Sequence, residues 1–255
     1  MTTSLRWTET LRVRSFDVAS DGLLSLPALA GYLQEAASRH ATALEVAFLQ
    51  VEGRPVFWVL HQLRLQLHRR PAWAETVHVD TWPCGHRGLR ALRAYAVRDE
   101  NGCLLAEGLS AWLLVDPVRR RPVRLPPEVL RLRGEATSPV PPETALPAVP
   151  EIPPRWSDTV RVRFSDLDRN GHANNTRYLA WLLDALPDTQ RACSLQTLVI
   201  TFRSEARLND PVVVESWPLE PNRLRHRFTH STDRQLLAEA LTVWAHSDTA
   251  PSGSA

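Results

Sequence analysis

The sequence predicts an α+β fold made of two tandem copies of one unit, each a long helix packed on an antiparallel sheet. Three observations lead to this prediction. The chain contains an internal duplication, each copy places a helical apolar pattern before a series of alternating segments, and a proline-rich stretch separates the copies. One long helix followed by several antiparallel strands is typical of an α+β unit whose helix is buried on the sheet.

The duplication consists of three collinear matches. The offset between the copies falls from 149 to 135 to 132 residues along the chain, so only short deletions are needed in the second copy. Chance is a poor explanation for three matches in the same order. The matching segments are Arg12-Val13-Arg14 with Arg161-Val162-Arg163, Trp82-Pro83 with Trp217-Pro218, and Leu104-Leu105-Ala106-Glu107 with Leu236-Leu237-Ala238-Glu239.

Each copy shows the same order of predicted elements. In the first copy, Pro27 suits the first position of a helix, and apolar residues follow it at helical spacing up to Ala37. Apolar and polar residues then alternate over 62–68 and 77–81, as expected for strands with one buried face, and 99–102 reads as a turn. The second copy repeats this order from 178 onward. We expect the two units to pair as a pseudo-twofold dimer within one chain.

The predicted domain boundaries follow from the proline content. Seven prolines lie between 139 and 154, and such a segment is extended and reads as a linker. We predict an N-terminal domain over 1–134, a linker over 135–155, a C-terminal domain over 156–247 and a disordered tail over 248–255. The tryptophans at 58, 73, 82, 112, 217 and 244 are expected in the core or in a cavity wall.

The composition and net charge of the chain argue against some classes of function. The chain has 255 residues, is 44% hydrophobic and 23% charged, and carries a net charge of +2. This charge is too small to indicate a nucleic-acid partner. Its three cysteines lie far apart and read as free thiols of a reducing compartment. No apolar run approaches the length of a membrane span, and the N-terminus lacks an apolar leader, so we expect a soluble cytoplasmic protein.

The candidate site lies in the run from Ser165 to Asn175, which precedes a helix of the second copy. At the offset of 149, its polar residues replace residues of different chemistry in the first copy. The pairs are Asp168 for Ala19, Asn170 for Asp21, His172 for Leu23 and Asn174 for Ser25; further along, Glu205 replaces Arg70. A purely structural turn has little reason to hold this set in one copy only. We therefore expect the chemistry in the second copy.

This run resembles the signature of the plant and bacterial acyl-ACP thioesterases, which are tandem hotdog enzymes. The resembling pattern is Asp168-x-Asn170-x-His172-x-Asn174-Asn175-x-x-Tyr178-x-x-Trp181, with Phe202-Arg203-Ser204-Glu205 further on. The resemblance implies hydrolysis of fatty acyl-ACP to free fatty acid and holo-ACP, with acyl carrier protein as partner and no cofactor or metal. It also implies an acyl cavity in the non-catalytic N-terminal domain, and catalytic roles for Asp168, Asn170, His172 and Glu205. Many relatives have Cys after this Glu, whereas this chain has Ala206, so a thiolate mechanism is excluded at that position.

Thioester hydrolysis needs a polarised carbonyl, an activated water and a proton for the leaving thiolate. We expect the backbone N–H groups of Gly171 and His172, at a helix N-terminus, to bind the developing oxyanion. Glu205 would act as general base, and Asp168 would orient Asn170 or His172. Which of Asn170, His172 and Glu205 activates water stays open, as do the acyl chain length and saturation that the enzyme prefers.

Several alternatives stay open. The carrier could be coenzyme A instead of a protein, or the chain could be a non-catalytic acyl-binding regulator. A hotdog dehydratase is a further alternative, but its reaction would not need Glu205.

A calcium loop starting at Asp166 is disfavoured because its twelfth position is Arg177. Asn174 or Asn175 suits a helix N-cap. Arg119, Arg120, Arg121 and Arg124 form one candidate docking cluster for an acidic carrier. The chain is expected to be either a monomer with an internal pseudo-dimer or a homodimer.

Overall fold

The computed structural model describes residues 5–132, 138, 140 and 145–245. The chain divides into two compact units, Met1–Thr144 and Ala145–Ala255. Within the predicted linker, residues 145–155 form neither helix nor strand, while 135–137, 139 and 141–144 lie outside the described residues. The predicted tail over 248–255 also lies outside them.

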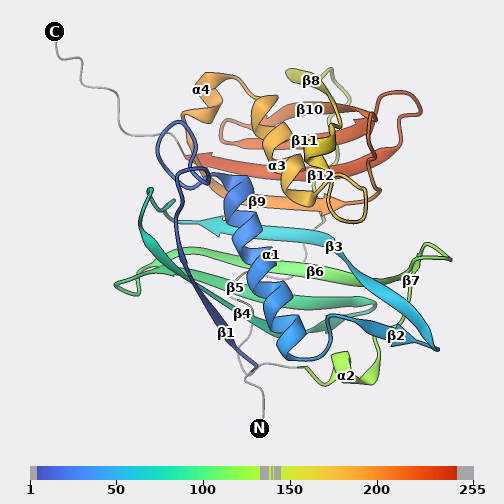
Figure 1. Ribbon diagram of the computed structural model, residues 1–255. Helices are drawn as coiled ribbons and strands as arrows, with labels where there is room; N and C mark the ends of the chain where they lie inside the picture. The colour runs from blue at the N-terminus through green and yellow to red at the C-terminus, as the bar shows by residue number, and fades with distance from the viewer. Residues whose placement is uncertain (1–4, 133–137, 139, 141–144, 246–255) are drawn as a thin grey trace. The chain divides into compact units, whose positions relative to one another are not determined.

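Unit 1 is an antiparallel sheet with one long helix on its face (Figure 1). Its sheet has the order β1-β4-β5-β6-β3, with β2 paired to β3 and β7 paired to β6. Its elements are β1 (Trp7–Arg12), α1 (Leu26–Ala43), β2 (Leu49–Val51), β3 (Arg54–Leu67), β4 (Thr76–Arg87), β5 (Arg90–Asp99), β6 (Leu104–Asp116), β7 (Arg121–Pro122) and α2 (Pro127–Leu130).

Helix α1 begins as the sequence predicts. Ser25 is its N-cap and accepts a hydrogen bond from the Ala28 N–H, and Pro27 lies in the first turn, where a missing N–H costs nothing. The apolar face of α1, including Leu29 and Leu33, is buried, and the helix contacts β4 and β1. Burial of this face, rather than intrinsic propensity, provides most of the stability of such a helix.

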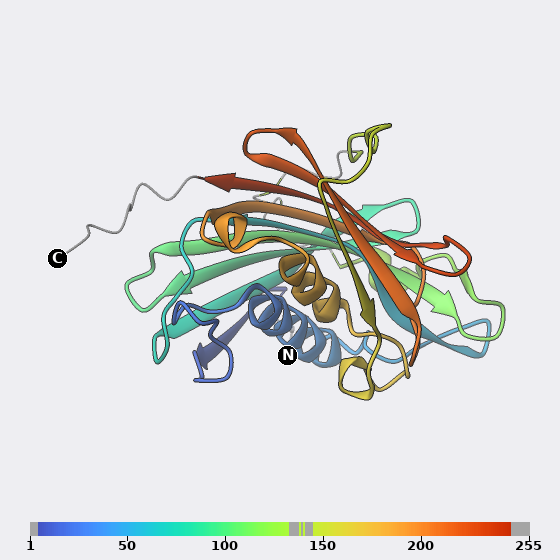
Figure 2. The same ribbon diagram turned by 90° about the horizontal axis from the view of Figure 1, so that it is seen from above.

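Unit 2 repeats this architecture with a shorter helix. Its sheet has the order β9-β12-β11-β10-β8, and Tyr178 of α3 packs its ring against Phe202 of β9 and Phe228 of β11. Helix α3 lies on one face of this sheet, as Figure 2 shows from above. The elements are β8 (Trp156–Arg161), the 3-10 turn η1 (Phe164–Asp166), α3 (Asn175–Asp184), α4 (Asp188–Arg191), β9 (Ser194–Phe202), β10 (Pro211–Glu220), β11 (Arg223–His230) and β12 (Leu236–Ala245).

The duplication extends to individual backbone contacts. The isolated bridges Val18–Leu24 and Leu23–Ala72 of unit 1 recur in unit 2 as Leu167–Ala173 and His172–Arg207. These are the offsets of 149 and 135 residues found in the sequence. The turn glycines also match, with φ of 76° at Gly22 and 77° at Gly171, a left-handed conformation that favours glycine. The duplication read from the sequence is therefore confirmed at backbone level.

The alternating segments form strands whose predicted inner residues are buried. Val77 and Val79 of β4, and Val212 and Val214 of β10, are fully buried. One tryptophan prediction is wrong, because Trp73 is 64% exposed in the loop after β3. The sequence pattern missed this because an aromatic residue in a loop has no strand neighbours that would bury it. No helix in the described part of the chain is both long and apolar enough to cross a bilayer.

Candidate active site

A short turn in unit 2 carries three of the four predicted catalytic residues. The bridge between Leu167 and Ala173 closes this turn, and Asp168 organises it from within. The Oδ1 atom of Asp168 accepts hydrogen bonds from the N–H of Asn170 at 2.8 Å and from the N–H of His172 at 3.2 Å. Asp168 therefore orients both residues through their backbone.

The turn brings His172 beside Glu205, which follows β9. The backbones of His172 and Arg207 form a bridge, and the Ala173 N–H donates to the Ala206 carbonyl at 2.8 Å. As a result, His172 Nε2 lies 3.1 Å from Glu205 Oε2. The side chains are 25% and 34% exposed respectively, so solvent and a substrate can both reach the pair. Such an imidazole–carboxylate contact is suited to proton transfer.

Tyr178 of α3 is buried against β9, the strand that leads to Glu205, a position that the sequence did not indicate. Tyr178 is 2% exposed, and its ring packs against Phe202 of β9 and Phe228 of β11. Burial raises the pKa of Tyr178 well above its usual value, and the charges of Asp210 and Glu205 raise it further. The Glu205–Ala206 segment itself is held by the Ala173 N–H, which donates to the Ala206 carbonyl. The available signal was the asymmetry of the copies, since the first copy has Leu29 at this position.

The Gly171 and His172 N–H groups, which were predicted to bind an oxyanion, have hydrogen-bond partners within the turn. The Gly171 N–H donates to the Asp168 carbonyl at 3.0 Å, and the His172 N–H donates to the Asp168 side chain. Both donors are used to close the turn, because a turn this tight satisfies its own backbone groups. The Asn170 side chain is exposed and makes no hydrogen bond within the described part of the chain. Its amide is the available donor on this turn.

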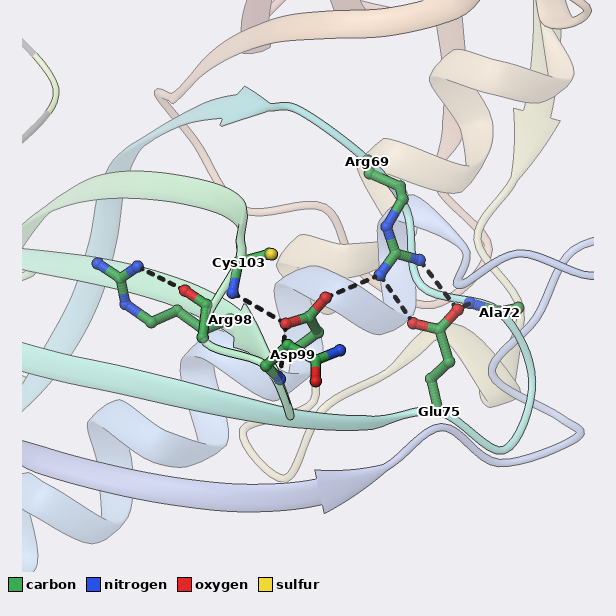
Figure 3. Close-up of polar contacts among 8 residues, drawn as sticks. Arg69, Ala72, Glu75, Arg98, Asp99 and Cys103 are labelled. Carbon is green, nitrogen blue, oxygen red and sulfur yellow. Dashed lines mark hydrogen bonds and ion pairs between the residues drawn. The ribbon is translucent and has the colours of Figure 1, made fainter.

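The corresponding loops of unit 1 lack these side chains. Arg70 and Asp21 form an ion pair where the second copy has Glu205 and Asn170, and Leu23 stands in place of His172. Figure 3 shows the neighbouring contacts: Arg69 donates to both oxygens of Glu75 at 2.9 Å and lies 3.5 Å from Asp99. Hydrogen bonding from Arg69 lowers the pKa of Glu75 below its usual value. The first copy therefore uses its charged residues to hold its loops together.

The structure shows what the other polar residues of the motif bind, including those that suggested an N-cap or a calcium loop. Asn174 is the N-cap of α3, since its Oδ1 accepts the Thr176 N–H at 2.9 Å. Asp166 is buried, accepts the Arg163 N–H at 2.8 Å and lies 2.7 Å from Arg177 Nε. The two carboxylates of the motif thus bind backbone N–H groups and an arginine. Among the described residues, no group of three His, Cys, Asp or Glu side chains is placed to hold a metal ion.

Two family models cover most of the chain. The model described as the acyl-ACP thioesterase N-terminal domain matches residues 4–132, and the acyl-ACP thioesterase C-terminal domain matches residues 153–246.

Known proteins resemble the chain in both sequence and fold. The chain is 30% identical to a chloroplastic palmitoyl-acyl carrier protein thioesterase of Cuphea hookeriana, over 72% of this chain and 48% of the relative. It is 29% identical to a chloroplastic dodecanoyl-[acyl-carrier-protein] hydrolase of Cinnamomum camphora, over 78% of this chain and 56% of the relative. The chain thus spans about half the length of the curated relatives it matches.

Solved structures share the fold. An acyl-ACP thioesterase from Bacteroides thetaiotaomicron gives a TM-score of 0.85 at 20% identity, covering 94% of this chain and 97% of that one. The 12:0-ACP thioesterase from Umbellularia californica gives 0.84 at 22% identity, covering 97% of this chain and 100% of that one. At these identities the likeness establishes the fold alone, and it confirms the prediction of tandem hotdog domains.

Proposed function

The chain belongs to the acyl-ACP thioesterase family, and from this membership we propose that it hydrolyses fatty acyl-ACP to free fatty acid and holo-ACP. The observation that carries the proposal is the contact of His172 Nε2 with Glu205 Oε2 at 3.1 Å. This pair exists in the second copy, whereas the first copy has Leu23 and Arg70 at the same positions. Acyl carrier protein, joined to the acyl group by its phosphopantetheine thioester, is the proposed partner.

We propose that Glu205 is the general base. Its carboxylate takes a proton from a water molecule, whose oxygen attacks the thioester carbonyl carbon. The side-chain amide of Asn170 donates to the carbonyl oxygen, which becomes negative as the tetrahedral intermediate forms. The C–S bond then breaks, and the proton held by the Glu205–His172 pair is transferred to the leaving pantetheine thiolate. Asp168 holds the turn in place, and the enzyme needs no cysteine at position 206.

The experiment is a thiol-release assay of the purified chain against a panel of acyl-ACP and acyl-CoA thioesters of increasing acyl length. We expect hydrolysis of acyl-ACP with a higher kcat/KM than of acyl-CoA. If only acyl-CoA is hydrolysed, the carrier is coenzyme A and not acyl carrier protein. Binding of acyl-ACP without thiol release would favour an acyl-binding regulator.

Glu220→Gln is a matched control for the substitution of Glu205. Glu220 ends β10, at the opposite end of this sheet from the site, and its side chain is 57% exposed. Glu205→Gln should abolish most of the activity, and Glu220→Gln should leave it unchanged. The cytoplasmic location and the pairing of the two units as a pseudo-dimer stay predictions.

A further inference from the structure

Three arginines surround the candidate site on the loops that build it. Arg163 precedes η1, Arg169 lies in the turn of His172, and Arg207 follows Glu205; all three are exposed. Backbone hydrogen bonds link these loops. The His172–Arg207 bridge joins the turn to the loop after β9, and the Val162 N–H donates to the Asp210 carbonyl at 3.0 Å. We call Arg163, Arg169 and Arg207 the arginine rim.

The first copy is an internal reference for these positions. Arg14 corresponds to Arg163, but its guanidinium is 2.7 Å from Asp17 and is therefore neutralised within the unit. Ser20 and Ala72 stand in place of Arg169 and Arg207. The nearby Arg69 and Arg70 pair with Glu75 and Asp21 (Figure 3 shows the former pair). The arginines at or near the corresponding positions of the first copy are thus paired within unit 1.

The nearby carboxylates leave two members of the arginine rim, Arg163 and Arg169, without an ion pair among the described residues. Asp166 is paired with Arg177, Asp168 binds two backbone N–H groups, and Asp210 accepts the Arg207 N–H with its side chain. Glu205 Oε2 is 3.9 Å from Arg207 Nη2 but 3.1 Å from His172. Arg163 and Arg169 form no ion pair with any described residue. The copy that carries the catalytic pair therefore also presents positive charge around it.

Two large apolar side chains lie on the same loops. Phe164 is 83% exposed and Leu208 is 46% exposed. Unit 1 also exposes apolar residues, Phe16 and Trp73, so charge rather than apolarity distinguishes the two copies. Arginine and aromatic side chains together are typical of protein–protein interfaces, where aromatic anchors supply contact area and charges select the partner.

We propose that the arginine rim, with Phe164 and Leu208, is the surface on which an acidic acyl carrier protein docks. This inference rests on the proposed function, since it names the face through which the carrier delivers its thioester. An acidic partner complements the unpaired guanidinium groups of Arg163 and Arg169, and docking at the rim places the carrier's phosphopantetheine arm beside the His172–Glu205 pair. Free coenzyme A offers phosphates to the arginines but no apolar surface for Phe164 and Leu208.

The test compares the parent with a double variant, Arg163→Gln with Arg169→Gln. Arg207 is left intact because of its proximity to Glu205. The matched control is Arg223→Gln at the start of β11, at the opposite end of this sheet, where Arg223 pairs with Glu220 at 3.0 Å. Binding of holo-ACP, which carries no acyl group, is measured by biolayer interferometry at several salt concentrations. Hydrolysis is measured on acyl-ACP, acyl-CoA and the matching acyl-pantetheine.

We expect the double variant to weaken holo-ACP binding about tenfold and to reduce its salt dependence. Its KM for acyl-ACP should rise by a similar factor, with kcat and the acyl-pantetheine kinetics unchanged. Holo-ACP binding equal to that of the parent would overturn the proposal. An equal rise in KM for acyl-CoA would also overturn it, since the arginines would then recognise phosphate. If the parent binds holo-ACP through the arginine rim but releases no thiol from acyl-ACP, the proposed hydrolysis is wrong, while the proposed docking surface is retained.

Discussion

Acidification should destabilise unit 2 through one buried histidine, His226 of β11. Its ring is fully buried, with Nδ1 2.8 Å from the Ser216 hydroxyl and Nε2 2.8 Å from the Thr242 hydroxyl. Burial lowers the pKa of His226 from 6.5 to about 3, and the neighbouring charge of Arg225 lowers it further. The ring is therefore neutral in the folded protein at all ordinary pH values.

The sign and size of the effect follow from proton linkage. Between pH 6.5 and 3 the unfolded chain binds a proton at this position and the folded chain does not, so the free energy of unfolding falls as the pH falls. One pKa unit corresponds to about 1.4 kcal/mol. Relative to neutral pH, the loss due to His226 should reach about 2 kcal/mol at pH 5.

The assay is urea denaturation at pH 7 and pH 5, comparing the parent with His226→Gln, which cannot take up the proton. His226→Gln should be less stable at pH 7 because it disturbs two buried hydrogen bonds, but it should lose about 2 kcal/mol less than the parent on acidification. His86→Gln, an exposed histidine of β4, is the control and should follow the parent. Parallel losses in the parent and in His226→Gln would refute the reasoning.

Three further predictions concern the site. Glu205→Gln should lower kcat by a factor of about 10² to 10⁴ with an unchanged Tm; near-parental thiol release would remove Glu205 from the mechanism. Tyr178→Phe keeps the ring that packs against Phe202 and Phe228 and removes only the hydroxyl, so kcat and KM should stay close to those of the parent. Tyr32→Phe, which removes a hydroxyl that donates to Asp17 in unit 1, is its control and should change stability only. Asn174→Ala should cost about 1 kcal/mol in a urea titration, because α3 loses its N-cap.

Local patterns predicted the elements well, because periodicity and capping depend on neighbouring residues. Pro27 marked the start of α1, and the alternation around Leu63 and Leu65 marked a strand with a buried face. Comparison of the copies predicted which half holds the polar set. The distance between His172 and Glu205 was beyond such reasoning, since 33 positions separate them and they meet through backbone contacts between the two loops, such as the His172–Arg207 bridge.

Predictions about single polar groups were less reliable. The sequence shows which donors exist but not which acceptors already hold them, so the Gly171 and His172 N–H groups were assigned to substrate although the turn uses both. The sequence also does not show which charged side chains are buried. Arg225, in a segment of alternating basic residues, is 2% exposed and donates to the carbonyls of Pro147, His226 and Ala240. Whether an arginine faces water depends on which strands flank it.

By itself, the sequence determined that the fold is a doubled α+β unit, that the second copy carries the polar set, and which family the chain resembles. These properties are encoded in spacing and in differences between matching positions, which need no coordinates. The tertiary structure decided which of these residues meet, which donors are free and which charges stay unpaired. The reason is physical: hydrogen bonds, desolvation and ion pairs act over a few ångströms in space, whatever the separation along the chain.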